Sequence, residues 1–526
     1  MTQRTLLAPF SQSSDAPAIL LPASATPQNV TVSYDHLRQL VDGVRQQLDA
    51  WDGNLAHGDV VSLSLINNLE FAAAFLGIGA HRCVAAPLNP GYKPQEVSFY
   101  LTDTKCKLLL VPQGALSSKP THPAVQAARE LNVAVAEIAF DGSRIELSFE
   151  TGTKGRGGRI QGSGQPRESD VALVLHTSGT TGRPKAVPLT HLNLATTMQN
   201  IINTYNLSPR DRTYLVMPLF HGLLAGFLAP LLSGGSIVVP PKFSAGVFWD
   251  EFTATKANWY TAVPTIHQIL LRTPTPKSLP QIRFIRSCSS ALAPATFTQL
   301  ESAFNAPVLE AYAMTEAAHQ MTSNPLPPAK RKPGTVGLGQ GVSIRILAFD
   351  KDEDVEEGEV SIKGANVTLG YINNPEANSK SFTKDGYFRT GDRGRLDEDG
   401  YLVLTGRLKE LINRGGEKIS PLEVDAALLD VDAVGEAVAF GVPDEKYGEK
   451  VWACVVLKKG AKVSERDVIE QCKKNISSAS HVPCFKVPER VFVVAEIPRG
   501  PTGKISRVAI AKNYSEEEQA QVKAKL

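Results

Sequence analysis

The sequence is poor in cysteine, in long apolar segments and in net charge. Only 6 of its 526 residues are cysteine. None forms a CxxC pair or another metal-ligand spacing, which excludes a disulfide-stapled fold and a zinc module. The longest apolar runs, such as 71–80 and 223–232, have about ten residues, whereas a membrane-spanning helix needs ~20. The first residues lack the apolar core of a secretory signal, so we expect neither a membrane span nor secretion.

Charges of the two signs nearly balance, with 55 Lys and Arg against 53 Asp and Glu. A dedicated nucleic-acid-binding protein needs a strong basic excess on one face, so no nucleic-acid partner is expected. A hydrophobic content of 42% and a charged content of 21% are ordinary for a globular chain and exclude disorder and collagen-like repeats. The scattered cysteines are expected to be reduced thiols in an intracellular compartment.

Helical and strand patterns alternate along the first third of the chain, which predicts crossover units on a parallel sheet. The expected helices are 36–51, 69–79 and one from Ala124, and the expected strands are 60–66, 107–111, 133–140 and 171–176. The Gly-rich, basic stretch 151–169 is expected to be a surface loop. After Glu359 the pattern changes to short strands and turns, and a smaller unit of alternating strands and helices begins near Lys409.

The strongest local signal is TSGTTGRPK at residues 177–185, directly after the strand pattern 171–176. Glycines let the backbone turn sharply and bring N–H groups close to an anion, while hydroxyls and a lysine add donors and charge. The segment is not a Walker A loop, because no Ser or Thr follows Lys185 to hold magnesium. It is a candidate phosphate-binding loop, and a flexible Ser/Thr/Gly turn is the alternative.

This loop resembles the phosphate loop of the acyl-adenylate-forming superfamily, which includes acyl-CoA synthetases, aryl-CoA ligases, luciferases and peptide-synthetase adenylation domains. Five further motifs follow in the family's order: MPLFHG at 217–222, YAMTEAAH at 312–319, YFRTGDRG at 387–394, GRLKELINRGGEKISPLEVD at 406–425 and PRGPTGKIS at 498–506. The resemblance covers nearly the whole chain. It implies an α/β fold with a large, multi-lobed N-terminal domain, 1–408, whose parallel or mixed sheets lie between helices. It also implies a small, mobile α+β C-terminal domain, 409–526.

The first half-reaction implied by the resemblance displaces pyrophosphate from the α-phosphorus of ATP. The attacking carboxylate is already an anion, so the site needs no general base but must hold two anions together. The resemblance assigns adenylation to Lys504, with Thr315, Glu316 and His221 as further catalytic residues. Glu316 suits magnesium, which prefers one or two carboxylates plus phosphate oxygens.

The nucleotide site implied by the resemblance surrounds adenine, ribose and phosphates. Asp392 suits the ribose diol because an ionised carboxylate accepts two hydrogen bonds, although a Gly-Asp pair can also cap a turn. The full set is Thr177, Ser178, Gly179, Thr180, Thr181, Gly182, Lys185, Ser290, Ala291, Glu310, Ala311, Tyr312, Thr315, Asp392, Arg407 and Lys504.

The second half-reaction, attack of the coenzyme A thiol on the acyl-adenylate, involves a swing of the C-terminal domain in this family. Lys409 matches the hinge position. Gly415 and Gly416 follow, where small residues would let the pantetheine arm pass beside the backbone. A plain hairpin turn explains the two glycines equally well.

The acid pocket departs from the common pattern, because RSCSSALAP at 286–294 has polar residues where many relatives have Gly and Ala. Polar groups left unpaired beside a fatty chain would cost ~1–3 kcal/mol each. With RSCSSALAP, TEAAH and LINRGGEKISP together, the chain resembles oxalyl-CoA synthetases, which implies oxalate as the substrate and His221, Ser289 and His319 as the residues that hold it. The alternatives are a medium-chain fatty acyl- or aryl-CoA synthetase and, in another class, a non-catalytic adenylate- or lipid-binding relative. A luciferase-like oxygenase uses the same adenylation motifs.

The last three residues, Ala524, Lys525 and Leu526, resemble a variant of the Ser-Lys-Leu peroxisomal signal. The expected partner is therefore a peroxisomal import receptor, and the expected location is the peroxisomal matrix or the cytoplasm. A fraying amphipathic helix that ends in these residues is the alternative.

Overall fold

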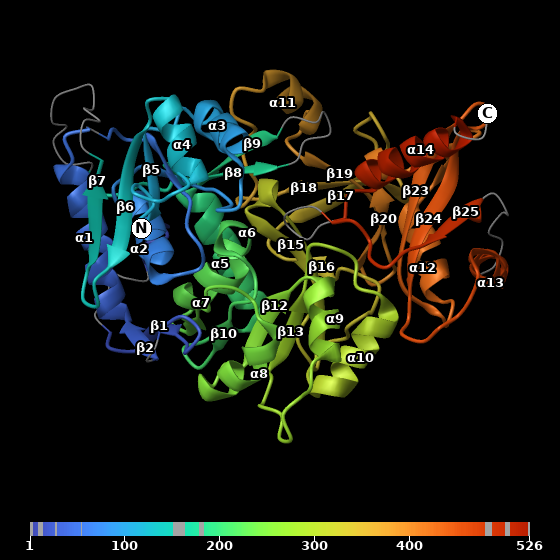
Figure 1. The fold of residues 1–526 in the computed structure, drawn as a ribbon, viewed down its shortest axis with the longest axis horizontal. Coiled ribbons are helices and arrows are strands. Elements are labelled where there is room, and N and C mark those ends of the chain that lie inside the picture. The colour runs from blue at the N-terminus through green and yellow to red at the C-terminus, as the bar shows by residue number, and fades with distance from the viewer. Residues whose placement is uncertain are drawn as a thin grey trace. The chain divides into compact units, whose positions relative to one another are not determined.

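In the computed structural model the chain forms two compact units, residues 1–343 with 362–388, and residues 344–361 with 389–526. The structure describes residues 4–8, 14–26, 29–53, 55–150, 164–177, 184–478, 486–499 and 505–523, without the side chains of 221–222, 477–478 and 517–523. Figure 1 shows the helices and strands as a ribbon, coloured along the chain from blue at the N-terminus to red at the C-terminus. The predicted boundary near Lys409 falls inside the second unit and stays a prediction.

The first large sheet of the first unit has seven strands in the order β7-β6-β5-β3-β4-β8-β9. Its strands are β3 Val60–Leu63, β4 Val84–Pro87, β5 Leu108–Pro112, β6 Ala134–Phe140, β7 Ile145–Phe149, β8 Val171–Thr177 and β9 Lys185–Thr190. The five central strands are parallel and the edge strands β7 and β9 are antiparallel to their neighbours. The crossover helices between its parallel strands are α2 Leu69–Ala80, α3 Pro94–Asp103 and α4 Pro123–Glu130, and α1 Tyr34–Ala50 leads into β3. The predicted strand–helix alternation is confirmed, except that the strand expected over 60–66 ends at Leu63.

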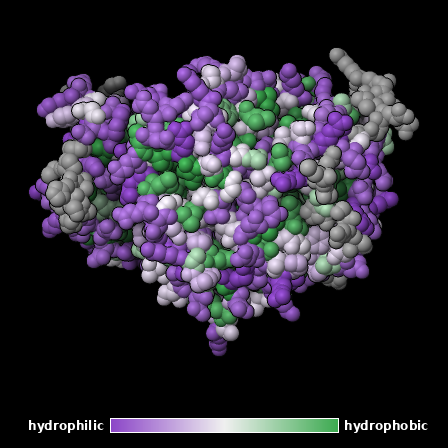
Figure 2. Space-filling view, turned by 180° about the vertical axis from the view of Figure 1, so that it is seen from behind, coloured by the Kyte–Doolittle hydropathy of each residue, from purple (hydrophilic) through white to green (hydrophobic). Residues whose placement is uncertain are grey.

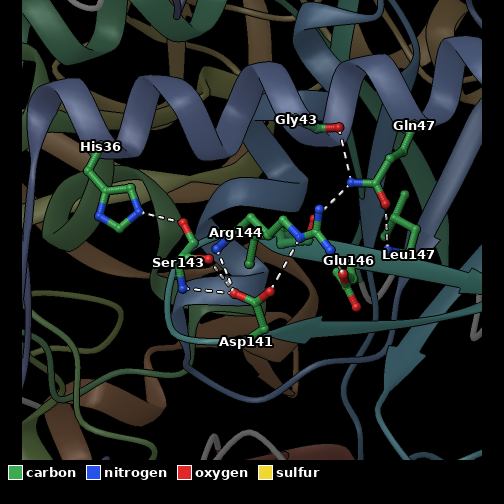
Figure 3. A network of polar contacts seen from close by, with 9 residues as sticks. His36, Gly43, Gln47, Asp141, Ser143, Arg144, Glu146 and Leu147 are labelled. Atoms are coloured by element: carbon green, nitrogen blue, oxygen red, sulfur yellow. Dashed lines mark hydrogen bonds and ion pairs between the residues drawn. The ribbon is translucent and has the colours of Figure 1, made fainter.

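Helix α1 closes the exposed edge of this sheet through a polar side chain (Figure 3). The Gln47 side chain donates to the carbonyl of Ile145 at 2.8 Å and accepts from the N–H of Leu147 at 2.8 Å. It therefore satisfies the groups on β7 that a further strand would use, which protects the edge from pairing with another chain. His36 contacts the carbonyl of Ser143 at 2.8 Å at the other end of the helix.

The second sheet of the first unit has nine strands in the order β16-β15-β14-β13-β12-β10-β11-β1-β2. They are β1 Pro17–Leu21, β2 Val30–Ser33, β10 Arg212–Tyr214, β11 Ser236–Val238, β12 Trp259–Ala262, β13 Phe284–Ser287, β14 Val308–Met314, β15 His319–Ser323 and β16 Leu338–Gly339. The helical segments of this part are α5 His191–Tyr205, α6 Leu219–Leu223, the π-helix η2 Leu224–Leu228, α7 Ala229–Leu232, α8 Ala245–Ala254, α9 Pro264–Arg272, α10 Pro294–Phe304 and α11 Pro375–Ser381. One apolar core joins Tyr260 and Ile285 of the strands to Phe248, Leu270 and Leu300 of α8, α9 and α10.

The second unit holds two smaller sheets. The first has the order β17-β18-β19-β20, with β17 Ser343–Leu347, β18 Glu357–Lys363, β19 Phe388–Leu396 and β20 Leu402–Arg407. The second combines β21 Ile412–Arg414, β22 Glu417–Ile419, β23 Val434–Asp444, β24 Gly448–Leu457 and β25 Arg490–Val493. The short 3-10 helix η4 Leu408–Glu410 links the sheets, and α12 Pro421–Leu429, α13 Glu465–Ser478 and α14 Arg507–Lys523 complete the unit.

Two expectations drawn from composition are met in the described residues. Cys83, Cys106, Cys288, Cys454 and Cys472 are all free thiols and all buried, while Cys484 lies outside the described residues. Within the described ranges, no helix has both the length and the apolar character needed to cross a membrane. The face seen in Figure 2 is mostly hydrophilic, with hydrophobic patches among the polar side chains, as on ordinary protein surfaces.

Candidate active site

The candidate phosphate loop connects two paired strands. β8 ends at Thr177 and β9 begins at Lys185, and these two residues are register partners. The strands therefore hold both ends of the loop side by side. The loop residues Ser178, Gly179, Thr180, Thr181 and Gly182 lie outside the described residues.

Glu316 lies beside the ends of this loop. It sits in the 3-10 turn η3 Thr315–Ala317, which follows β14, and only 6% of the residue is exposed. The Oε1 atom of Glu316 accepts hydrogen bonds from the Tyr371 hydroxyl at 2.9 Å and from the Thr177 hydroxyl at 3.4 Å. The structure therefore brings Thr177 to the Thr315–Glu316 turn, although Thr177 and Glu316 are 139 residues apart in the sequence.

Tyr371 is a site residue that the motif analysis missed. Besides donating to Glu316, its ring lies 4.7 Å from the ammonium nitrogen of Lys185, within cation–π distance. Burial and the neighbouring Glu316 raise the pKa of the Tyr371 phenol, so the hydroxyl remains a donor. The backbone N–H of Thr368 donates to the Glu316 carbonyl at 2.7 Å, which fixes the same turn. In the sequence, Tyr371 stands out only as part of a Gly-Tyr pair before residues 372–376, INNPE. Its spacing from Glu316 and Lys185 does not indicate that it contacts them.

The arrangement around Glu316 fits a magnesium ion. Both hydrogen bonds to the carboxylate use Oε1, so no described residue hydrogen-bonds to Oε2. A single carboxylate oxygen beside a phosphate loop suits Mg²⁺, which keeps most of its ligands as water and phosphate oxygens. The described residues contain no cluster of three or more potential His, Cys, Asp or Glu ligands, so an ion here would depend on the bound nucleotide.

Glu310 occupies β14 beneath the loop that carries Ser290 and Ala291. Its carboxylate accepts from the N–H of Gly334 at 3.1 Å and from the backbone of Leu292. Burial raises the pKa of Glu310 to about 7. The carboxylate thus supports the 288–292 loop from within, whereas Ser290 and Ala291 are exposed. Ala311 and Tyr312 are buried in the same strand.

Two of the predicted acid-binding residues have unusual backbone angles. Ser289 has φ 76° in the loop after β13, and His319 has φ 104° at the start of β15, after Ala318 with φ 47°. Left-handed angles are uncommon for residues with a Cβ, and such strain concentrates at functional sites. The backbone therefore presents the Ser289 and His319 side chains from two strained turns that most residues would avoid.

The third predicted acid-binding residue, His221, lies in α6, where the structure describes its backbone only. The segment before it is held by Asn67, which follows β3. The Asn67 amide donates to the Met217 carbonyl at 3.1 Å and accepts from the Leu219 N–H at 2.6 Å. Asn67 is a second residue that the sequence analysis missed, because an Asn-Asn pair before a helix predicts only a cap, which Asn68 provides for α2.

In the second unit, the structure pairs the two residues predicted to contact the ribose. Asp392 on β19 and Arg407 on β20 are register partners, and Arg407 Nε lies 3.1 Å from Asp392 Oδ1. The Asp392 side chain is 10% exposed and that of Arg407 is 54% exposed. The guanidinium is therefore fixed by the carboxylate and remains open to an anion.

The predicted CoA and hinge residues are also in the second unit. Lys409 lies in η4, and Gly415 and Gly416 form the two-residue turn between β21 and β22. Both glycines have positive φ, 62° and 93°, as the favoured two-residue hairpin turn requires. Turn geometry alone explains this pair, so a role in binding CoA stays a prediction. Lys504 lies outside the described residues.

Comparisons with known proteins show the family of the chain. The AMP-binding enzyme family matches residues 9–372, and the AMP-binding enzyme C-terminal domain matches residues 423–504. An oxalate–CoA ligase of Saccharomyces cerevisiae is 47% identical over 530 residues, which cover 95% of each chain. An oxalate–CoA ligase of Arabidopsis thaliana is 46% identical, with 92% of this chain and 94% of that protein covered.

A solved structure extends the agreement to three dimensions. ATP-bound MatB from Rhodopseudomonas palustris has a TM-score of 0.85 and 29% identity, with 98% of this chain and 99% of that chain covered. The matches thus span nearly the full length in both sequence and fold. The chain belongs to the family of AMP-binding enzymes, and within it this protein is an ATP-dependent acid–CoA ligase.

Proposed function

We propose that this ligase activates oxalate and transfers the oxalyl group to CoA. The observation that carries the proposal is the near full-length similarity, at 47% and 46% identity, to two proteins named oxalate–CoA ligase. The polar residues at the expected acid positions support it, since Ser289 and His319 occupy positions with backbone angles that are uncommon for residues with a Cβ. A pocket for an alkyl or aryl acid gains nothing from such residues.

In the first step, an oxygen of one oxalate carboxylate attacks the α-phosphorus of ATP. The new P–O bond forms as the bond to the β-phosphate oxygen breaks, and pyrophosphate leaves. Lys504 and Lys185 are proposed to stabilise the negative charge on the phosphates, and Thr177 and Thr315 to position them. Glu316 would hold magnesium, which supplies further neutralisation of phosphate charge. Asp392 and Arg407 are proposed to fix the ribose.

In the second step, the CoA sulfur attacks the carbonyl carbon of the oxalyl-adenylate. The C–S bond forms, the C–O bond to AMP breaks, and the thiol proton passes to solvent. Lys409 is proposed as the hinge about which the C-terminal domain swings between the two steps. Gly415 and Gly416 are proposed to form the backbone beside the pantetheine arm of CoA.

A panel of acids tests the substrate. Oxalate, malonate, hexanoate and 4-coumarate are each supplied with ATP and magnesium, and acid-dependent exchange of pyrophosphate into ATP is measured, followed by AMP release with and without CoA. We expect oxalate to give the highest kcat/KM by at least roughly tenfold. Equal or better exchange with hexanoate or coumarate would assign the chain to another acid. The Lys504→Ala variant should lose exchange with every acid, and retained exchange would contradict the adenylation role.

The proposed cellular location of the enzyme rests on Ala524, Lys525 and Leu526, which lie outside the described residues. We propose that they bind a peroxisomal import receptor and direct the enzyme to the peroxisomal matrix. A fluorescent protein ending in residues 515–526 should then co-localise with a peroxisomal marker, and the same fusion with Leu526 removed should remain in the cytosol.

A further inference from the structure

The largest buried cation of the described residues is Arg286 in β13, which is 1% exposed. Its guanidinium donates to the Tyr205 hydroxyl at 2.9 Å, the Thr261 hydroxyl at 3.0 Å and the Gln320 amide oxygen at 3.1 Å. It also contacts the Cys288 sulfur. Within the described part of the chain, none of its partners is a carboxylate.

A fully buried Arg without an acidic partner is rare, because arginine is almost never fully buried unless it is paired. Hydroxyl and amide oxygens accept from the N–H groups of Arg286, and no carboxylate among its described partners compensates its positive charge. Burial raises the pKa of Tyr205, so this phenol stays neutral and is no counter-ion. Arg507, which is nearly buried, differs in this respect, since Asp425 and Glu410 both pair with it.

The surroundings of Arg286 connect it to the acid-binding residues. Thr261 lies on β12, which pairs with β13, and Gln320 lies on β15, which β14 separates from β13. The π-helix η2 packs against β12, β15 and α5. A Cβ added at Gly226 of η2 would lie only 3.4 Å from Thr261 Cγ2, which shows how closely this helix covers the strand that holds the guanidinium. π-helical turns occur mostly at functional sites.

Each predicted acid-binding residue lies on an element next to this buried charge. Ser289 follows Arg286 by three residues, His319 directly precedes Gln320 in β15, and His221 lies in α6, which continues into η2. The three predicted acid-binding residues thus lie on, or close in sequence to, the elements around Arg286.

On the basis of the proposed function, we infer that Arg286 is a specificity-determining residue that favours an acid with a second carboxylate. One carboxylate of any acid reacts with ATP, so every relative must admit a monoanion. The second carboxylate of oxalate remains ionised during the reaction and needs positive charge nearby in a low-dielectric pocket. Arg286 supplies this charge through the sheet, without contact with the reacting atoms.

Two variants test the inference in complementary ways. Arg286→Met removes the charge and keeps much of the volume, while Gln320→Glu keeps Arg286 but places a carboxylate at the atom it already bonds. Both should lower the ratio of kcat/KM for oxalate to kcat/KM for glycolate, a two-carbon acid with one carboxylate. We expect a fall of at least roughly tenfold in each variant, with the KM for ATP little changed. Arg286→Lys should retain most of the oxalate preference.

Arg212 offers a matched control in the same sheet. It lies on β10, and its Nε donates to the hydroxyl of Ser236 at 2.8 Å, another neutral acceptor. Arg212→Met should alter stability without changing the oxalate-to-glycolate ratio. An unchanged oxalate-to-glycolate ratio in Gln320→Glu, including equal losses of kcat/KM for both acids, would overturn the inference. This outcome counts even if Arg286→Met fails to fold. If the wild-type enzyme showed no preference for oxalate, the proposed function itself would fail, which is a separate outcome.

Discussion

Ser289 and His319 have strained backbone angles, so the effect of each residue on stability can be measured apart from its effect on activity. A left-handed angle costs a residue with a Cβ roughly 1–2 kcal/mol, whereas glycine adopts it freely. Ser289, with φ 76°, is exposed in the loop after β13, so its side chain contributes little to the core. Ser289 therefore holds a backbone angle that glycine adopts more easily, at a position where its side chain packs little against the core.

Ser289→Gly should therefore lower activity without lowering stability. Relief of strain and the greater freedom of the unfolded glycine nearly cancel, so we expect the free energy of unfolding to change by less than about 1 kcal/mol. Loss of a hydrogen bond to the acid should lower kcat/KM for oxalate by roughly 10- to 100-fold. Chemical denaturation and the exchange assay measure the two effects. A marked loss of stability with unchanged oxalate activity would show that the serine serves the loop instead.

Tyr371→Phe tests how Glu316 is oriented. The variant removes the hydroxyl that lies 2.9 Å from Glu316 Oε1 but keeps the ring beside Lys185. A hydrogen bond to a charged group contributes about 1.5–3 kcal/mol. We therefore expect the magnesium concentration that gives half-maximal exchange to rise roughly tenfold or more, because the carboxylate is no longer held. An unchanged magnesium dependence would mean that the Thr177 hydroxyl and the turn orient Glu316 without Tyr371.

Motif analysis located Glu316, Asp392 and Arg407 but missed Tyr371 and Asn67, for a physical reason. Residues that contact ligand recur in short motifs, because several must lie within one loop. Residues that hold such loops in place act across long separations in sequence, as Asn67 does on the segment around Met217 and Leu219. Neither residue type nor spacing reveals such a partner before the fold is known.

At the level of elements, periodicity predicted the crossover helices and parallel strands because each buries a recognisable apolar face. The strand expected over 60–66 ends early at Leu63, although apolar residues continue to Ile66, which is 53% exposed. The Asn68 side chain accepts from the Phe71 N–H and begins α2, so the chain turns away from the sheet before its apolar pattern ends. The cap of α2, and not the apolar pattern of the sequence, thus determines where the strand ends.

Strand β14 and the loop it supports are sensitive to pH through Glu310. Its pKa is raised by burial from 4.5 to about 7, so folding favours the protonated form. The stabilising contribution is complete below about pH 4.5 and is lost as the pH rises through about 7. The carboxylate is then buried with only backbone N–H groups to compensate it.

Glu310→Gln removes this dependence while keeping an oxygen that can accept from Gly334 and Leu292. We expect the variant to match the wild-type enzyme at pH 5 and to exceed its free energy of unfolding at pH 8, by on the order of 1–3 kcal/mol. Chemical denaturation at both pH values measures this difference. A variant that is equally destabilised at pH 5 and pH 8 would show that the charge is needed for the loop.

For the molecule as a whole, a hinge at Lys409, as proposed, would make full turnover depend on a rotation of the chain at this residue. Glu410 Oε2 lies 3.3 Å from Arg507 Nε, and Arg507 also pairs with Asp425 of α12. The buried network therefore fixes the residue after Lys409 to the helix that follows Lys504 in the sequence. A rotation at Lys409 would move these elements together, so one backbone position could control both half-reactions.

Lys409→Pro should separate the half-reactions. Proline fixes φ near −65° and restricts the residue before it. Full turnover requires both orientations, whereas each half-reaction measured alone requires one. We therefore expect turnover to fall by at least roughly 10²-fold, while either pyrophosphate exchange or thioester formation from supplied acyl-adenylate persists. Lys409→Ala, which keeps the backbone free, should retain all three activities. If the proline variant lost both half-reactions while remaining folded, or kept full turnover, the hinge would have to lie elsewhere in the chain.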